Sequence, residues 1–497
     1  MNKTTLFIYS LFLSYTLTAQ NKYGHQWLFE NFNTVDFRGD SIVIGQLQPD
    51  PLYNIGAAFA SNLCDKNGNI IMQTGGCYVI NKAFALMKGG DPVNVQSTSL
   101  LGYCKPGDPH GYFPFKQNNL FINYPNDSTK YLLFNMDFDT LFPFPSNIVF
   151  LPPHLFYHVI DMAKDNGHGE VVDKFKIAIQ DTLSRGYLTA IKHSNNKDWW
   201  VIIPKWKSDC FFVVPVTSNG VGTPQKQCTG FVWKADPDLG GQVAASADGT
   251  KYARVNHKDT IVVYNFNPTT GQFSNPIRLS HPDSASFLQG VCFSQNNRFL
   301  YVTYKLKVFQ YDLQAIDIQA SMTVVGDVSA FTQNAERGAL QVSKLAPDGK
   351  IYISSPFSHR FLSVINRPNC KGILCDFRPY AVELKFYNWG ALPNNPFFEI
   401  PPANYNCDSL RTPVQDITPH ITISPNPTQF IITISSNYIF ETFTITNIMG
   451  QTMNIGKMKG SEQNEIDVSK LPDGVYFLHL INSKVQTKAI GKFMIKK

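Results

Sequence analysis

Two histidines, His154 and His158, have a spacing that metal ligands can have. On a helix, side chains four residues apart lie on one face, where two imidazoles could bind the same ion. The segment that contains them, HLFYH, lacks the glutamate of the HExxH motif of metalloproteases. We therefore expect surface or packing histidines here and no metal site.

The segment Asp65-Lys66-Asn67-Gly68-Asn69 begins like a calcium-binding loop but lacks the later glutamate that would complete one. A tight hairpin turn accounts for the same residue types. The sequence also contains no GxSxG nucleophile elbow and no phosphate-binding P-loop. We predict no catalytic residue, no cofactor and no metal from local motifs.

Aromatic residues offer an alternative kind of site, a surface on which a carbohydrate could stack. The candidates are Trp199, Trp200, Trp206, Tyr252 and Tyr304. In a strand, Trp199 and Trp200 point to opposite faces, so at least one of them belongs to a core. Burial is the favoured interpretation, and glycan stacking stays open as the alternative.

The cysteine count is odd, since nine cysteines remain after the predicted signal peptide. At least one thiol must then be free or pair outside the chain. Cys210 and Cys228 flank a strand, a turn and a second strand, which would place them opposite each other. Cys370 and Cys375 bracket a short loop and form a second candidate pair. Buried free thiols are the alternative for several of these cysteines.

One pattern recurs through the body of the chain: an apolar strand, a short Asp/Asn/Gly turn and a second apolar strand. The turns are Asn67-Gly68, Asn126-Asp127, Asn195-Asn196, Asp248-Gly249, Asn296-Asn297 and Asp348-Gly349. Such pairs supply the positive φ angles of tight hairpins. The last four turns follow at intervals of 53, 48 and 52 residues.

A period near 50 residues with about four strands per unit is typical of a β-propeller blade. In residues 241–280 the four strands can be assigned one by one, and residues 291–326 repeat the scheme. We predict an all-β fold with a propeller over residues 24–400, seven blades being favoured over six. Residues 389–400 would give the inner strand of a last blade that residues 25–47 complete.

The second unit is longer than the others. Between Phe142 and Arg185 the sequence predicts the best helix of the chain, which begins at Pro152-Pro153 and runs through HLFYHVIDMAKD. We expect this segment to be an insertion on one rim of the ring.

The N-terminus predicts export. Lys3 precedes an apolar stretch over residues 6–17 and the small or polar residues 18–20, so residues 1–19 are typical of a signal peptide. We expect no transmembrane segment in the mature protein. The net charge of +6 is spread along the chain, which argues against a nucleic-acid partner.

A proline-rich stretch over residues 401–419 predicts a linker. Residues 420–497 then show short alternating strands separated by turns, the pattern of a small Ig-like antiparallel β-sandwich. The turn and entry residues of this domain are Pro425, Asn426, Pro427, Gly450, Leu471, Gly474 and Tyr476.

These residues give the domain its resemblance to a known family. The elements Pro425-Asn426-Pro427, Ile448–Gln451, Leu471–Tyr476 and the terminal KFMIKK strand resemble the type A sorting domain of type IX secretion (Por secretion system) cargo. The body resembles secreted propeller-like proteins that carry such domains, over stretches such as WLFENFNTVDF and APDGKIYIS. The resemblance implies recognition by the type IX translocon and sorting machinery, followed by attachment to the cell surface or release.

For the body, we expect a non-catalytic role in binding or adhesion, with a surface glycan or a protein as the ligand. The alternative is an exported hydrolase or lyase with its site at the mouth of the central channel, because propeller enzymes assemble their sites from several blades. A structural component of surface motility machinery is a third hypothesis.

Overall fold

The computed structural model describes the chain from residue 22 to residue 497 with internal gaps. The residues not described are 1–21, 30–31, 48–60, 95–115, 138, 144–147, 231–240, 257–259, 282–288, 332–337, 357–358, 389, 391, 397–399, 401–402, 404, 408–420, 437–439, 460, 462 and 483–486. The predicted signal peptide therefore lies outside the described residues. The chain divides into two compact units, residues 1–410 and 411–497.

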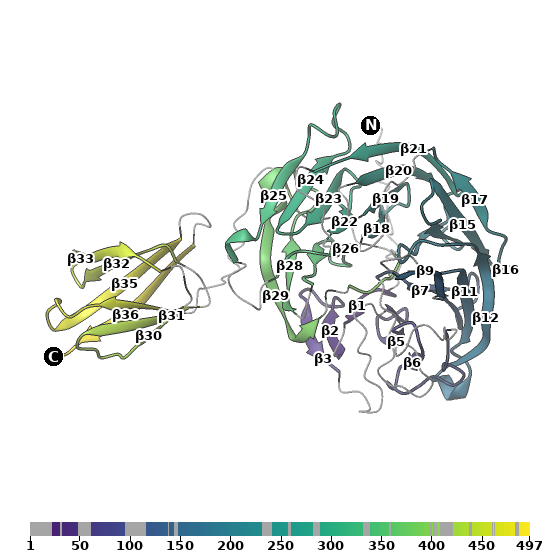
Figure 1. Ribbon diagram of the computed structural model, residues 1–497. Coiled ribbons are helices and arrows are strands. Elements are labelled where there is room, and N and C mark those ends of the chain that lie inside the picture. The colour runs from purple at the N-terminus through teal and green to yellow at the C-terminus, as the bar shows by residue number, and fades with distance from the viewer. Residues whose placement is uncertain are drawn as a thin grey trace, which may run out of the picture. The chain divides into compact units, whose positions relative to one another are not determined.

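The described part of the first unit contains eight antiparallel sheets: one two-stranded hairpin, and seven larger sheets that follow one another along the chain and surround a common centre (Figure 1). The first two sheets have three strands each: β1 (Gln26–Leu28), β2 (Asn33–Asp36) and β3 (Val43–Gln46), then β4 (Ser61–Cys64), β5 (Ile70–Thr74) and β6 (Val79–Asn81). The third contains β7 (Asn119–Asn123), β8 (Lys130–Met136), β11 (His154–Asp161) and β12 (Glu170–Gln180). The fourth contains β13 (Thr189–Lys192), β14 (Trp199–Pro204), β15 (Cys210–Thr217), β16 (Gly220–Val221) and β17 (Gln225–Cys228).

The last three sheets have four strands each. They are β18 (Gln242–Ala245), β19 (Lys251–Val255), β20 (Ile261–Asn267) and β21 (Gln272–Leu279); β22 (Gln289–Phe293), β23 (Phe299–Tyr304), β24 (Lys307–Asp312) and β25 (Thr323–Asp327); and β26 (Ser343–Leu345), β27 (Ile351–Ile353), β28 (His359–Ile365) and β29 (Phe377–Asn388). Three short 3-10 turns lie at Asp165–Gly167, Ser329–Phe331 and Gly372–Cys375. Among the described residues, no helix is long and apolar enough to cross a membrane.

The predicted hairpins are confirmed. Each of the six Asn/Asp/Gly turns joins the first two strands of one sheet. One residue of every turn pair has a positive φ, between +58° and +88°, which Gly and Asn adopt at little cost. The all-β class of the body and its propeller architecture are thus as predicted.

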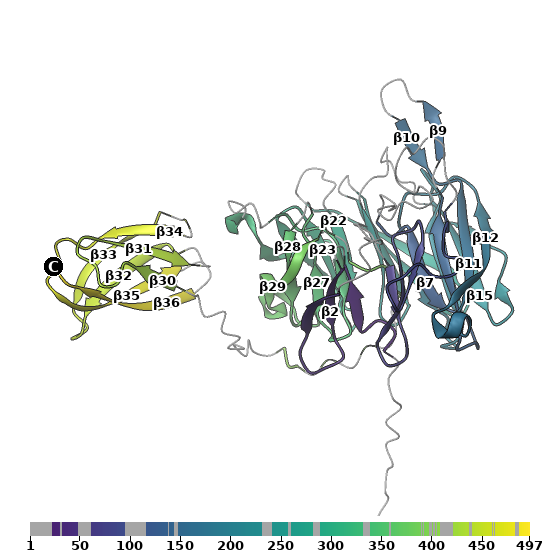
Figure 2. The same cartoon turned by 90° about the horizontal axis from the view of Figure 1, so that it is seen from below.

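The predicted helix is wrong. Residues 154–161 form strand β11, which lies between β8 and β12 in the third sheet. Pairing on both edges places the strand inside the sheet, and side chains on both of its faces, such as Leu155 and Phe156, are buried. Three register shifts against β12 disturb its alternation. The segment is therefore no rim insertion; what protrudes is the hairpin of β9 (Asp139–Pro143) and β10 (Ile148–Leu151) (Figure 2).

The ring also closes differently from the prediction. Strands β1–β3 form a sheet of their own, and the described part of 389–400 adds no strand to it. Prolines 393 and 396 lack the N–H that a central strand needs. At the junction, the Asn33 amide forms two hydrogen bonds with the backbone of Phe386 in β29: its Nδ2 donates to the carbonyl oxygen at 3.1 Å and its Oδ1 accepts from the N–H at 2.7 Å.

The second unit is a two-sheet sandwich, as predicted (Figure 2). One sheet contains β30 (Ile421–Ser424), β31 (Ile431–Ser436) and β34 (Gln463–Asp467); the other contains β33 (Thr452–Lys457), β32 (Thr442–Asn447), β35 (Gly474–Asn482) and β36 (Thr487–Ile495). The buried members of its hydrophobic core all come from residues 432–495. The sandwich thus has its own core.

Candidate functional site

The Pro425-Asn426-Pro427 segment covers part of the outer edge of β36. The Asn426 Nδ2 donates to the Lys492 carbonyl oxygen at 3.2 Å, and its Oδ1 accepts from the Met494 N–H at 2.9 Å. The prolines on either side have no N–H to offer, so the asparagine side chain takes the place of a paired strand. This arrangement occupies backbone groups that an edge strand would otherwise expose.

Leu471, Gly474 and Tyr476 form the adjoining part of the domain. Leu471 is buried in the sandwich core, and Gly474 begins β35 opposite Ile495. The Tyr476 hydroxyl donates to the Pro472 carbonyl oxygen at 2.8 Å, while its ring stacks on Phe493. These residues fix the last two strands against each other.

Gly450 lies in the turn between β32 and β33, where its φ of +78° favours glycine. The Asn447 Oδ1 accepts from the N–H groups of Met449 and Gln451, both at 3.0 Å. Asn447 also pairs with Tyr476 across the sheet, so this turn lies at the same end of the sandwich. We call residues 425–427, 447–451, 471–476 and 492–497 the motif end.

Of the predicted motif residues, Pro425, Asn426, Pro427 and Gly450 lie on the surface of the motif end, and only the side chains of Leu471 and Tyr476 shape it from within. Ile448 and Met449, by contrast, are 72% and 78% exposed at its tip. β30 runs from residue 421 toward the motif end, so the chain enters the domain at the opposite end. Sequence reasoning found the residues that form this end, including the segment Ile448–Gln451, but not that Ile448 and Met449 are exposed at its tip.

In the propeller, residues 392–396 cross the centre of the ring (Figure 1). The Asn394 Nδ2 donates to the carbonyl oxygens of Asn119 (2.8 Å) and Leu188 (3.0 Å), beside β7 and β13. The Ser61 hydroxyl, in β4, donates to the Asn394 carbonyl oxygen at 2.8 Å. The segment therefore bridges the inner strands of separate sheets and leaves beside it a cavity of about 50 Å³.

Lys344 in β26 holds this segment from another side. Its Nζ donates to the carbonyl oxygens of Pro393 at 2.7 Å and Asn395 at 2.8 Å. Burial lowers the pKa of Lys344 to about 7. Nothing in the sequence around Lys344 marked it; the Pro-Asn-Asn-Pro run at 393–396 was the available signal.

We expect Lys344→Met to lower the free energy of unfolding by about 1–3 kcal/mol, because two buried carbonyl groups lose their donor. The pKa of Lys344 is about 7 in the folded protein, whereas the ordinary pKa of a lysine, which applies to the unfolded chain, is 10.5. Between these values the unfolded chain binds more protons, so this lysine makes stability rise with pH by about 1.4 kcal/mol per unit. Denaturant unfolding of the full chain at pH 7.0 and 8.5 measures both effects.

The control for this prediction is Lys66→Met, which alters an exposed lysine in a hairpin turn. It should leave both the stability and its pH dependence unchanged. Equal pH slopes for the wild type and Lys344→Met would contradict the assignment of the titrating group.

A second pocket, of about 280 Å³, opens on the rim between the fourth and fifth sheets. The turns at 193–196 and 246–249 form its walls together with Pro268. The His193 Nε2 contacts the Thr269 carbonyl oxygen at 3.1 Å, and its Nδ1 accepts from the Asn195 N–H at 3.0 Å. Both nitrogens are occupied, so this histidine is not positioned as a free general base.

The Asp248 carboxylate in the same pocket is also occupied by local hydrogen bonds. Its Oδ1 accepts from the Ser246 hydroxyl at 2.7 Å and the Thr250 N–H at 2.9 Å. The rim pocket is thus a recess with both polar and apolar lining, in which His193 and Asp248 form hydrogen bonds within its own walls. Such a recess is better suited to binding than to proton transfer.

His154 and His158 do not converge, because four residues along a strand span roughly 13 Å. The His154 Nδ1 lies 2.6 Å from Asp137 Oδ2. The His158 Nε2 lies 2.9 Å from Asn135 Oδ1, and burial lowers the pKa of His158 to about 3. Each ring has its own partner within the third sheet.

The Asp65 segment and four of the five aromatic candidates are structural, whereas Trp206 is half-buried. The Asp65 Oδ1 accepts from the N–H groups of Asn67 (2.8 Å) and Asn69 (2.9 Å), as the hairpin interpretation requires. Trp199 and Trp200 are both buried, in cores on opposite sides of the fourth sheet, and Tyr252 and Tyr304 are fully buried. These four rings therefore form no exposed stacking surface.

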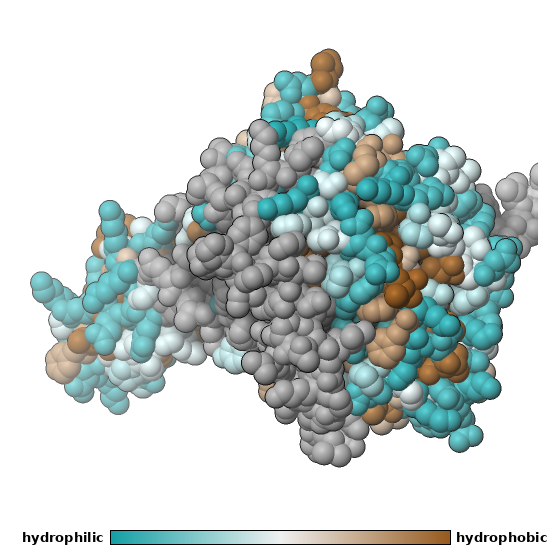
Figure 3. All heavy atoms as spheres, turned by 45° about the vertical axis from the view of Figure 1, so that its right-hand side comes forward, coloured by the Kyte–Doolittle hydropathy of each residue, from teal (hydrophilic) through white to brown (hydrophobic). Residues whose placement is uncertain are grey.

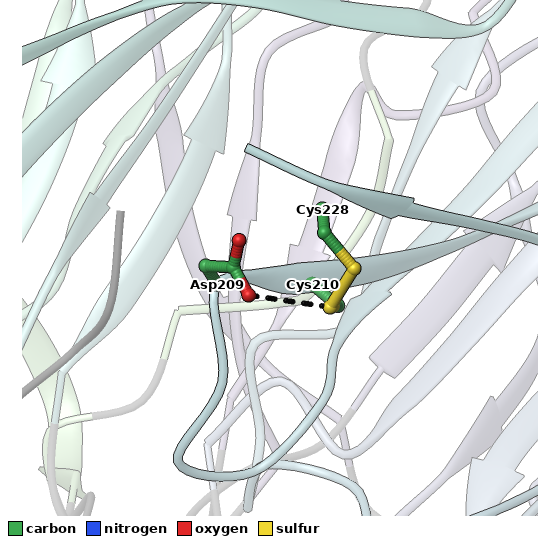
Figure 4. A group of neighbouring side chains, drawn as sticks. All are labelled: Asp209, Cys210 and Cys228. Atoms are coloured by element: carbon green, nitrogen blue, oxygen red, sulfur yellow. Dashed lines mark hydrogen bonds between the residues drawn. A yellow bond between two sulfur atoms is a disulfide. The ribbon is translucent and has the colours of Figure 1, made fainter. Parts of the chain in front are cut away.

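Cys210 and Cys228 are directly opposite in the β15–β17 pair and form a disulfide with an S–S distance of 2.00 Å (Figure 4). The Asp209 Oδ1 lies 3.3 Å from the Cys210 sulfur. Three potential metal-ligand atoms thus gather here. Because both sulfurs are bonded to each other, neither is a thiolate that could bind an ion.

The predicted Cys370–Cys375 pair is wrong. Cys370 bonds to Cys407 instead, with an S–S distance of 2.13 Å. The Tyr405 hydroxyl accepts from the Asn369 N–H at 3.1 Å, so the chain returns to this loop after 37 residues. Cys375 is a buried free thiol, like Cys64 and Cys292, and burial raises the pKa of each to about 12. These thiols are protonated and unreactive at neutral pH.

Comparison with known proteins identifies the tail. Residues 422–496 match the family described as "Secretion system C-terminal sorting domain". The predicted type IX sorting domain is therefore confirmed, and the tail directs the chain to the cell surface or the extracellular space. No curated protein matches the chain.

Several solved structures are similar to the chain at low identity. PorZ, a surface component of the type IX secretion system of Porphyromonas gingivalis, is 9% identical with a TM-score of 0.34; the match covers 94% of this chain but only 63% of PorZ. A putative 6-phosphogluconolactonase from Bacteroides uniformis is 10% identical with a TM-score of 0.41, over 74% and 99% of the two chains. A periplasmic gluconolactonase from Pseudomonas aeruginosa is 12% identical with a TM-score of 0.31, over 95% and 96%.

Proposed function

We propose that the body is a non-catalytic binding or adhesion module, which its sorting domain delivers to the outside of the cell. The observation that carries this proposal is the central segment, residues 392–396, which bridges the channel where a propeller enzyme would place its site. The propeller would then act as a rigid support for ligand contacts on its rim.

The rim pocket between the turns at 193–196 and 246–249 is the ligand site that we propose. It is the larger of the two cavities described above, and local hydrogen bonds hold its walls. Hydroxyl, amide and carboxylate groups line it together with apolar residues such as Ile191 and Pro268, so we expect a ligand with both polar and apolar groups, such as a surface glycan or a loop of a protein. On the described part of the face shown in Figure 3, hydrophilic side chains surround smaller hydrophobic groups.

Screening the exported body against a glycan array and purified surface proteins tests this proposal. Ala247→Trp would fill the rim pocket, and we expect it to weaken binding at least tenfold. The matched control, Ala315→Trp, places the same side chain in an exposed loop away from the pocket and should bind like the wild type. Equal binding by both variants would exclude the rim pocket as the site.

One observation favours a second candidate function, an exported hydrolase or lyase. Among the residues that the structure describes, none forms a hydrogen bond with the buried Nζ of Lys116, and burial lowers the pKa of Lys116 to about 7. Amines that are neutral near pH 7 can act as bases or nucleophiles. Turnover of a bound ligand that Lys116→Met abolishes would support this candidate, whereas binding without turnover would support the first.

A further inference from the structure

The two outer faces of the sorting sandwich have different chemistry. On the sheet of β30, β31 and β34, most side chains that point outward are polar or acidic. They include Thr422, Ser424, Thr433, Ser435, Gln463, Glu465 and Asp467. Apart from Ile431, which is 47% exposed, this face has the composition of an ordinary solvated surface.

The outer face of the other sheet is apolar. One row of side chains runs across its four strands, from Ile455 through Thr444 and His479 to Ile490. Ile455 is 70% exposed and Ile490 is 64% exposed. Phe477 and Met494 lie on the same side of the neighbouring strands β35 and β36. We call these six residues the apolar face.

The charges beside the apolar face are all positive among the described residues. Lys457 of β33 lies opposite Thr442, and Lys492 of β36 lies opposite Phe477. Both lysines therefore point to the same side of the sheet as Ile455 and Ile490. No aspartate or glutamate occupies an outward position of the described residues in this sheet. An apolar surface with lysines at its margins is complementary to an apolar surface flanked by carboxylates.

We propose that the apolar face is the surface by which the sorting machinery holds this domain, and that its partner is a protein with an apolar, acid-flanked surface. A protein fits better than a lipid, because Thr444 and His479 interrupt the apolar row with groups that need hydrogen-bond partners. The proposal rests on the sorting identity of residues 422–496 and is independent of the ligand of the propeller.

Export of full-length variants in a host with type IX secretion tests this proposal. Ile455→Thr with Ile490→Thr removes apolar area and keeps β-branched residues suited to strands. We expect at least a tenfold fall in surface and secreted protein, with the chain accumulating in the periplasm. The control, Phe430→Thr with Ile431→Thr, changes residues of similar exposure, 61% and 47%, on the other sheet, and should be exported normally.

Reversal of charge gives a second comparison. Lys457→Glu with Lys492→Glu should reduce export, while Glu465→Lys on the polar face should not. Thermal unfolding of each purified full-length variant shows whether it folds as the wild type does.

Three results would overturn the proposal. They are normal export of the folded apolar-face variants, equal loss of export in the control, and normal export combined with loss of binding to phosphatidylcholine–phosphatidylglycerol vesicles. The last result would assign the face to a lipid surface. Normal export after deletion of residues 420–497 would instead remove the sorting premise itself.

Discussion

Deletion of residues 420–497 is expected to trap a folded propeller in the periplasm. The N-terminal signal would still carry the chain across the inner membrane, but the translocon would have no sorting domain to recognise. The core of the sandwich draws its buried members from residues 432–495 alone, and none of the propeller cores includes them. Loss of the sandwich should therefore leave the propeller stable. Cell fractionation with immunoblotting measures location, and thermal unfolding of the periplasmic protein measures folding.

A gain-of-function experiment completes this prediction. Residues 401–497 placed behind a signal peptide and a fluorescent reporter should carry the reporter to the surface or the medium. In the same fusion, Asn426→Ala removes two hydrogen bonds from the edge of β36 and should reduce export. The deleted chain reaching the outside as efficiently as the intact one would refute the role of the tail.

The turns of the propeller could be predicted because the residues of each turn determine its backbone conformation. Gly249 and Gly349 need a positive φ, and the residue type alone signals this need. The sandwich motifs were predictable for a similar reason, since Gly450 forms a turn with a positive φ and Leu471 fills the core of its own domain. These features need no knowledge of distant parts of the chain.

The strand at 154–161 was missed because its neighbours decide its conformation. Apolar residues at 155, 156, 159 and 160 fit a helical spacing, and Pro152-Pro153 suits a helix start. In the fold, β8 and β12 pair with both edges of this segment, and side chains on both of its faces are buried, so no regular alternation remains. The sequence also contained evidence for a strand in this segment, the aromatic and β-branched residues Phe156, Tyr157, Val159 and Ile160.

The centre of the ring could not be predicted for a related reason. Asn394 and Lys344 act through contacts with segments far away in the sequence. The Cys370–Cys407 bond likewise depends on how the chain returns after the last sheet. Spacing alone favoured Cys375 as the disulfide partner of Cys370, because only a few residues separate the two. The sequence does not indicate that a distant residue such as Cys407 folds back to the same place.

Removal of residues 22–47 is expected to unfold the propeller rather than shorten it. These residues form the first sheet, which packs on both of its neighbours in the ring. One core joins Trp27 and Val35 to Tyr352 and Leu362 of the last sheet; another joins Leu28 and Phe32 to Cys64 and Ile80 of the second sheet. Without the first sheet both interfaces would be exposed to water, and the ring would be open.

A single substitution tests the same interface in the full chain. Trp27 is 1% exposed. The centroid of its ring lies 4.8 Å from the ring centroid of Phe37 and 5.6 Å from that of Tyr352. Trp27→Ala should lower the free energy of unfolding by about 3–5 kcal/mol, because it leaves a large cavity between the first and last sheets. Val43→Ala, at a position 62% exposed in the same sheet, should cost less than about 0.5 kcal/mol. A cooperative melt with an unchanged midpoint after the truncation, or equal costs for the two substitutions, would show that the first sheet does not close the ring.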